Sequence, residues 1–216
     1  MLTLAVETSQ ARYALALGRD GAVLFDTLRD LGPDTGRDLG DLLALGLAHV
    51  GARAADIGAV AVDIGPGSLG SLRDGVAFTH GLAYARSLPV YAFTSFELIG
   101  AAAGATALRP ALCTRRANEG LAYAGLYDGG RVVVMRHGER ARVVADVAGA
   151  GTAFVAAGSF RAETAAQLAH ADVADSGVET PAAATMLTLG LAGRMPGDVL
   201  RSPVYPLHEG AAVFRE

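Results

Sequence analysis

The residues best suited to chemistry form a glycine-rich segment, Gly65-Pro66-Gly67-Ser68-Leu69-Gly70. An apolar run rich in β-branched residues precedes it, and a stretch with helical spacing begins at Ser71. Glycine makes tight turns at low steric cost, and a turn that opens a helix directs backbone N–H groups toward an anion such as phosphate. The segment therefore predicts either an anion site or a tight strand-to-helix turn.

Three interpretations of this segment were compared. Its spacing matches the dinucleotide fingerprint G-x-G-x-x-G, but the next expected strand, 90–93, does not end in the acid that would bind a ribose. The Walker A pattern is excluded, because Ser71 and Leu72 stand where it needs Lys followed by Ser or Thr. The third interpretation is a tight turn whose glycines serve backbone geometry alone.

The other reactive side chains form no recognisable catalytic pattern. The histidines are scattered, with no pair at the i, i+4 spacing that lets two imidazoles share a metal ion; they are His49, His80, His137, His170 and His208. All 18 basic residues are arginine, which excludes lysine chemistry, and the single Cys113 excludes an intrachain disulfide. We expect no catalytic residue and no metal site.

Composition favours a globular protein with a sizeable core. The chain has 216 residues, of which 51% are hydrophobic, and a formal net charge of -4. This charge argues against a strongly basic nucleic-acid binder. No apolar run reaches the roughly 18 residues of a membrane span, and the N-terminus lacks the basic and apolar regions of a signal peptide. We expect a soluble, cytoplasmic protein that does not associate with membranes.

Hydrophobic periodicity predicts the same element pattern in both halves of the chain. The first half is expected to contain strands at 2–6, 13–17, 22–27, 59–63 and 90–93, with helices at 36–50, 71–87 and 95–103. The second half is expected to contain strands at 111–114, 121–127, 131–137 and 153–157, with helices at 162–169 and 180–194. Three meandering strands followed by α/β alternation predict mixed sheets covered by helices. We place an N-terminal lobe at 1–104 and a C-terminal lobe with an extended tail at 105–216.

Several phrases of the sequence resemble the TsaB family, also called YeaZ. They are Leu4-Ala5-Val6-Glu7-Thr8-Ser9, the strand and glycine segment at 59–68 with Leu72-Arg73, and Leu88-Pro89-Val90 leading to Thr94-Ser95. The resemblance is strong from residue 2 to about residue 100 and fades beyond about residue 130. It implies an α/β protein with the actin-like ATPase (ribonuclease H-like) fold, built of two similar lobes with mixed sheets.

The resemblance also implies a function. TsaB-like proteins pair with their catalytic paralogue TsaD, which transfers a threonylcarbamoyl group to the adenosine beside the anticodon of tRNAs reading A-starting codons. The ATPase TsaE joins the pair. Family members lack the catalytic apparatus, so we expect an accessory subunit and not an enzyme. The alternative is an actin-like ATPase or nucleotide-binding enzyme that acts on its own.

Four residues carry the nucleotide loop that the resemblance implies: Glu7, Gly65, Gly67 and Ser68. In actin-like folds an acid on this first turn lies near nucleotide phosphates and magnesium. This chain has Glu where the family usually has Asp, and Asp74 adds a negative charge that opposes a bound phosphate. We therefore expect a vestigial loop that requires no cofactor, with ATP or ADP, where present, at the partner interface.

The resemblance places the partner contact on the first two helices of the N-terminal lobe, 36–50 and 71–86. The expected contact residues are Leu42, Leu45, Ser71, Gly75 and Thr79. The last three are small and four residues apart, a spacing that lets another helix approach closely. Both helices could instead simply cover the sheet, and a homodimer is the expected alternative when the chain is alone.

Arginines gather in the sequence of the second half. They are Arg115, Arg116, Arg136, Arg140 and Arg142. A basic patch and a solvated surface both fit this spacing, but acidic residues outnumber basic ones, 22 to 18, over the chain. We expect the solvated surface, and hence no direct tRNA binding.

Overall fold

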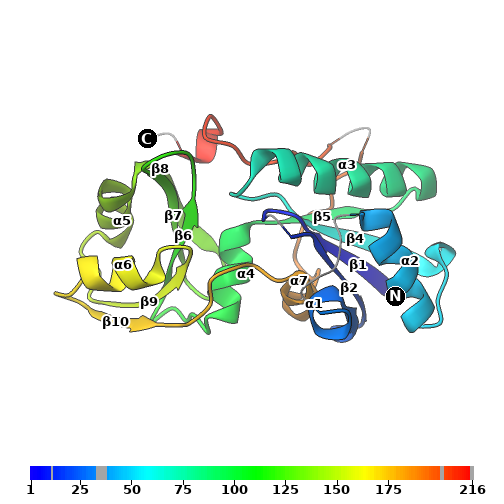
Figure 1. The fold of residues 1–216 in the computed structure, drawn as a ribbon, viewed down its shortest axis with the longest axis horizontal. Coiled ribbons are helices and arrows are strands. Elements are labelled where there is room, and N and C mark those ends of the chain that lie inside the picture. The colour runs from blue at the N-terminus through cyan, green and yellow to red at the C-terminus, as the bar shows by residue number, and fades with distance from the viewer. Residues whose placement is uncertain (11, 33–37, 200–201, 215–216) are drawn as a thin grey trace. The chain divides into compact units, whose positions relative to one another are not determined.

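The computed structural model describes residues 1–10, 12–32, 38–199 and 202–214. The chain forms two compact units (Figure 1): unit 1 comprises Met1–Thr94 and Ala182–Pro206, and unit 2 comprises Ser95–Pro181 and Leu207–Glu216. Each unit contains one five-stranded sheet with helices packed on it. No helix in the described ranges is long and apolar enough to cross a bilayer.

Unit 1 is built around strand β1. Its elements are β1 (Leu2–Glu7), β2 (Ala14–Arg19), β3 (Ala22–Asp26), α1 (Thr27–Asp30), α2 (Leu39–His49), the 3-10 helix η1 (Ala54–Asp56), β4 (Ile57–Asp63), α3 (Leu69–Arg86), β5 (Val90–Phe93) and α7 (Ala183–Leu189). The strand order is β3-β2-β1-β4-β5. β1 is antiparallel to β2 and parallel to β4. Because Val6 pairs with Val62, the acids that follow them, Glu7 and Asp63, leave the sheet side by side.

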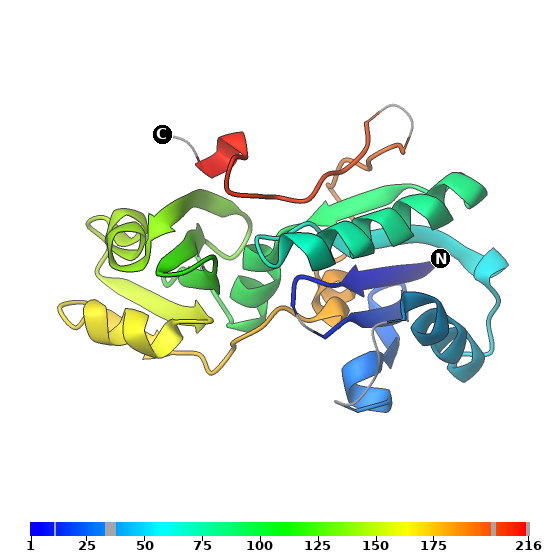
Figure 2. The ribbon, with the colours of Figure 1, turned by 45° about the horizontal axis from the view of Figure 1, so that its top comes forward.

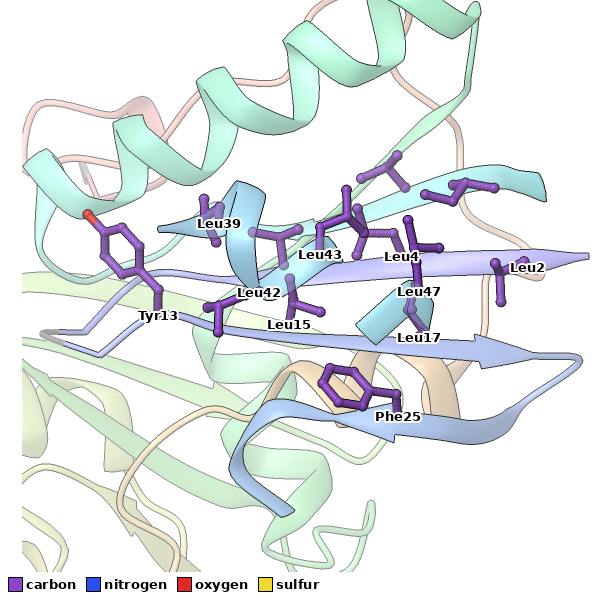
Figure 3. Close-up of a cluster of buried hydrophobic side chains, with 13 residues drawn as sticks. Leu2, Leu4, Tyr13, Leu15, Leu17, Phe25, Leu39, Leu42, Leu43 and Leu47 are labelled. Carbon is purple, nitrogen blue, oxygen red and sulfur yellow. The ribbon is translucent and has the colours of Figure 1, made fainter. Parts of the chain in front are cut away.

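Helices cover both faces of this sheet, as two successive residues of β2 show. Side chains alternate between the faces of a strand. A Cβ on Gly46 of α2 would touch Leu17, whereas a Cβ on Gly18 would touch Leu187 of α7. The α2 face carries a core in which leucines of α2 meet Phe25 and the leucines of β1 and β2 (Figure 3). The leucine stripe of α2 therefore packs on its own sheet.

Unit 2 repeats this topology. Its elements are α4 (Ser95–Ala102), β6 (Ala111–Arg116), β7 (Leu121–Tyr127), β8 (Val132–Glu139), α5 (Arg140–Ala148), β9 (Ala153–Gly158), α6 (Arg161–Gln167), β10 (Asp172–Asp175) and the 3-10 helix η2 (Ala212–Phe214). The strand order is β10-β9-β6-β7-β8, with β6 antiparallel to β7 and parallel to β9. The reversed order, β8-β7-β6-β9-β10, corresponds strand by strand to the order β3-β2-β1-β4-β5 of unit 1. The expected pair of similar α/β lobes with mixed sheets is confirmed.

The structure divides the chain at other positions than the expected boundary between residues 104 and 105. Helix α4 belongs to unit 2, because Phe96 is buried with Cys113 of β6. The segment 182–206 returns to unit 1: α7 packs on β1 and β2, and Val199 packs against the core under α3. Figure 2 shows the stretch after α7 running beside α3. Sequence order could not reveal this return, because an apolar position does not specify which sheet it covers.

Helix ends follow local capping chemistry. Helix α2 begins after Asp38, whose carboxylate accepts hydrogen bonds from the backbone N–H groups of Gly40 and Asp41. The predicted start at Gly36 lies outside the described residues. The helix predicted at 180–194 was too long, because α7 spans only Ala183–Leu189 and ends at Gly190, whose φ is 74°.

Helix α5 and strand β10 were missing from the sequence prediction. A signal for α5 was present: Glu139 caps the helix, and the buried Val143, Val144 and Val147 have helical spacing. Strand β10 is short and mostly exposed, with two acids in its four residues. It carries little of the apolar alternation that identifies a strand.

Candidate functional site

The glycine-rich turn of unit 1 contacts the turn that follows β1. Parallel neighbouring strands end at the same edge of a sheet, so the segments leaving β1 and β4 meet there. The Ser68 N–H donates to the Ser9 carbonyl oxygen at 3.0 Å. A Cβ on Gly67 would lie 2.5 Å from that same oxygen. Glycine at position 67 is therefore required by the close approach of the two turns.

Two N–H groups of the glycine turn donate to acceptors within unit 1. The Gly65 N–H donates to Asp63 Oδ1 at 2.8 Å, and the Ser68 N–H donates to Ser9 as described above. Pro66 has no N–H to offer. The structure thus brings Gly65, Gly67 and Ser68 together beside the Glu7 turn, but their geometry is that of a packed strand-to-helix turn, the third interpretation of the segment.

Glu7 is fully buried, and its own turn satisfies its carboxylate. Oε1 accepts hydrogen bonds from the Ser9 N–H at 2.6 Å and from Ser9 Oγ at 2.5 Å, and Oε2 accepts one from Gln10 Nε2 at 3.0 Å. Burial, together with the charge of Asp63, raises the pKa of Glu7 to about 7 against the opposing effect of these hydrogen bonds. The carboxyl group thus holds its proton more tightly than an exposed glutamate does, and it points into its own turn.

The Glu7 carboxylate is not placed to hold magnesium within unit 1. Magnesium takes carboxylates that remain open to the ion and its waters, whereas the oxygens of Glu7 already accept from Ser9 and Gln10. The described residues contain no group of three or more His, Cys, Asp or Glu side chains placed to hold a metal ion. Sequence reasoning named Glu7 as a site residue but missed Asp63. Asp63 ends β4, the strand parallel to β1 and next to it, and this position was a usable signal.

Asp74 has a structural partner within unit 1. The Tyr13 hydroxyl donates to Asp74 Oδ2 at 2.5 Å. Tyr13 immediately precedes β2, and Asp74 lies near the start of α3. This bond and the Ser68–Ser9 bond hold the first turns of α3 to the hairpin of β1 and β2.

The structure separates the residues expected to contact a partner. They are Leu42, Leu45, Ser71, Gly75 and Thr79. Leu45 is 52% exposed on α2, and Ser71 is half-buried, whereas Leu42, Gly75 and Thr79 are buried inside unit 1. A Cβ on Gly75 would overlap the Thr8 hydroxyl. Leu42, Gly75 and Thr79 therefore pack within unit 1: Leu42 belongs to the core under α2, and the small residues of α3 let it approach its own sheet.

The arginines of unit 2 do not act as one group. Arg115 is buried, with 6% of its surface exposed. Arg142 forms a solvent-exposed i, i+4 ion pair within α5. Arg116 and Arg140 share a different environment, because both guanidinium groups lie over the ring of Phe160.

Comparison with known proteins agrees with the fold and adds a family. The family model described as TsaD: tRNA N6-adenosine threonylcarbamoyltransferase matches residues 37–199. No curated protein matches this chain.

Two solved structures from Pseudomonas aeruginosa are similar over nearly the whole chain. One is YeaZ, which is 20% identical with a TM-score of 0.74, covering 96% of this chain and 99% of that chain. The other is an uncharacterized protein with similarity to peptidase YEAZ, also 20% identical with a TM-score of 0.74, covering 96% of this chain and 98% of that chain. At this identity the likeness shows the fold. The expected fold of two α/β lobes with mixed sheets and the resemblance to TsaB (YeaZ) are confirmed.

Proposed function

The chain belongs to the family described as TsaD: tRNA N6-adenosine threonylcarbamoyltransferase, because that family model matches residues 37–199. From this premise we propose that the protein is the TsaB-type accessory subunit of a tRNA-modifying complex. It pairs with TsaD, and TsaE joins the pair. The complex adds a threonylcarbamoyl group to the adenosine beside the anticodon of tRNAs reading A-starting codons. The YeaZ fold over 96% of the chain supports this assignment within the family.

The internal hydrogen bonds of Glu7, Gly65 and Ser68 support the proposal that this subunit is not the catalyst. An actin-like enzyme acting on its own needs an acid and N–H groups open to magnesium and phosphate. Here Glu7 is fully buried and bonded to Ser9 and Gln10, and the Gly65 and Ser68 N–H groups have internal acceptors. These contacts favour an accessory subunit over the alternative ATPase. No cofactor is required by this unit, and ATP or ADP handled by the complex lies at the partner interface.

We place the TsaD contact on the outer sides of α2 and α3. The two helices pack over the same core, since Phe78 of α3 contacts the cluster that holds the leucines of α2. Their outer surfaces expose Leu45, at 52%, and Tyr84, at 66%. Exposed large apolar side chains on adjacent helices are suited to a partner helix. A homodimer through the same surface is the alternative when the chain is alone.

Reconstitution tests the proposal. Purified chain, TsaD and TsaE are combined with the synthase that makes threonylcarbamoyl-adenylate and with an unmodified tRNA, and the modified nucleoside is measured by mass spectrometry. We expect modification only when TsaD is present and a marked loss when this chain is omitted. Modification by the chain without TsaD would refute the accessory role.

Titration separates the two candidate functions. Calorimetry with ATP and magnesium is expected to show weak binding and no turnover for the isolated chain. Tight binding accompanied by hydrolysis would favour the self-sufficient ATPase.

A further inference from the structure

A pocket of about 380 Å³ lies at one edge of the unit 2 sheet. Its walls come from the end of β6 with the hairpin that follows, the first residue of α5, and Phe160 after β9. Because β6 and β9 are parallel, this is the edge at which their carboxyl ends meet. Open α/β sheets bind ligands at that edge. Within unit 2, the pocket occupies the place that the Glu7 and Asp63 turns occupy in unit 1.

Two arginines line the pocket without acidic partners. The Cζ atoms of Arg116 and Arg140 lie 4.9 Å and 5.6 Å from the centroid of the Phe160 ring. Neither guanidinium makes an ion pair or hydrogen bond with any residue that the structure describes. The neighbouring Glu139 uses both carboxylate oxygens to cap α5, accepting from the N–H groups of Ala141 at 3.0 Å and Arg142 at 2.9 Å. The charge of Glu139 still interacts with that of Arg140, but the hydrogen-bond donors of both guanidinium groups are available to a ligand.

The frame that holds these side chains is hydrogen-bonded in advance. The Phe160 N–H donates to Thr114 Oγ1 at 3.1 Å, and that hydroxyl donates to the Ala157 carbonyl at 3.2 Å. The hairpin is closed by the Leu121 N–H, which donates to the Asn118 carbonyl at 2.9 Å. A site ordered before binding loses less entropy when the ligand enters.

We infer that this pocket binds a phosphate group of an RNA strand, an inference that rests on the proposed function in tRNA modification. Guanidinium groups form paired hydrogen bonds to phosphate oxygens, and Asn118 adds an amide at the pocket wall. The volume lies within the roughly 300–1,000 Å³ of typical ligand sites. The carboxylate of Glu119 also lines the pocket and opposes an anion.

The inference departs from the expectation, drawn from net charge, that the chain does not bind tRNA directly. Net charge averages over the whole chain, whereas a phosphate responds mainly to charges within about a Debye length, roughly 10 Å in 0.1 M salt. Of the five arginines that gather in the sequence of the second half, Arg115 is buried, and Arg142 already forms an ion pair with Asp146. Arg136 donates to the Met135 carbonyl oxygen, and the remaining two, Arg116 and Arg140, converge on the ring of Phe160.

Fluorescence anisotropy with the full chain and a labelled, unmodified tRNA tests the site, at several salt concentrations. Arg116→Ala and Arg140→Ala are each expected to weaken binding about tenfold, the effect of one charge-assisted contact. Each should also lower the slope of log affinity against log salt by about one. Glu119→Gln should strengthen binding, because it removes an opposing charge.

Arg131→Ala is the matched control. It removes the same charge from unit 2, but Arg131 lies at the hairpin between β7 and β8, at the opposite edge of the sheet. We expect its tRNA affinity to equal that of the unchanged chain. Equal weakening by Arg131→Ala, or no weakening by the two pocket substitutions, would overturn the inference.

Competition identifies the source of the phosphate. Excess AMP, inorganic phosphate and polyglutamate are each added to the chain–tRNA complex. Weak competition by AMP and phosphate supports a phosphate site for RNA. Tight AMP binding without tRNA binding, or displacement by polyglutamate alone, overturns it in favour of a free nucleotide or an acidic peptide.

Co-purification of the same variants with TsaD separates this inference from the proposed function. Retained pairing with lost tRNA affinity supports both. Retained pairing with unchanged tRNA affinity refutes the phosphate site alone. If the unchanged chain does not pair with TsaD, the proposed function is refuted. The tRNA affinity of the isolated chain still tests the phosphate site in that case.

Discussion

A Cβ added to Gly75 of α3 would overlap the hydroxyl group of Thr8 in the turn after β1. The Thr8 hydroxyl is itself buried and has no hydrogen-bond partner among the residues that the structure describes. Together with the Ser68–Ser9 and Tyr13–Asp74 bonds, this contact places α3 directly on the end of β1. Glycine at position 75 thus serves the close packing of α3 on this turn, and this role can be tested.

Gly75→Ala is expected to destabilise unit 1 by about 1–3 kcal/mol, the usual cost of overpacking. Gly81→Ala is the matched control, because Gly81 lies in the same helix with open space around it. There the gain in helix propensity should stabilise the protein by up to about 1 kcal/mol. Urea unfolding measures both. Thr8→Ala in the Gly75→Ala background should recover part of the loss, and a loss shared equally by both glycine variants would contradict the packing argument.

The stability of unit 1 is expected to fall as the pH rises from about 4.5 to about 7. In the folded protein the pKa of Glu7 is raised to about 7, mainly by burial, from an ordinary value of 4.5. The folded state therefore holds a proton that the unfolded state has released, and the free energy of unfolding drops by at most about 1.4 kcal/mol per pH unit. Above about pH 7 this contribution is flat.

Glu7→Gln should remove most of this pH dependence and make the protein more stable than the unchanged chain at pH 8. The glutamine can still accept from Ser9, and the Gln10 amide can rotate to meet its N–H groups. Glu163→Gln, at an exposed position on α6, is the control and should leave the profile unchanged. A Glu7→Gln profile parallel to that of the unchanged chain would show that Glu7 ionises normally.

Tyr13→Phe is expected to cost about 1 kcal/mol, the net value of one hydrogen bond, because it leaves Asp74 without the hydroxyl that donates to it. Tyr84→Phe, on the exposed surface of α3, should cost nothing measurable. Thermal or urea unfolding distinguishes the two. If both variants match the unchanged chain, the bond to Asp74 contributes nothing to stability.

Leu45→Asp is expected to weaken pairing with TsaD by more than tenfold and to change the free energy of unfolding by less than about 0.5 kcal/mol, as surface substitutions do. The side chain is 52% exposed, so its loss opens no cavity. Leu108→Asp makes the same change at a side chain that is 93% exposed in unit 2 and should leave pairing intact. Normal co-purification of Leu45→Asp with TsaD would place the interface elsewhere.

Local features of the chain were predicted well because their causes are local. The strand predicted at 90–93 is β5, and the helix predicted at 95–103 is α4, because both depend on the spacing of apolar residues along a short segment. Helix α5 was missed even though its cap and its valine spacing were both present.

The sequence by itself determined most of the strands and helices, the repeated α/β pattern, the family and the absence of lysine chemistry, because composition, periodicity and turn residues are properties of neighbouring positions. Only the tertiary structure decided that Gly75 faces Thr8, that Asp63 lies beside Glu7, that 182–206 returns to unit 1, and that Arg116 and Arg140 meet at Phe160. Each of these depends on which face of a helix or strand is buried against residues far away in the chain. That choice is made by packing of the whole unit, and no local pattern encodes it.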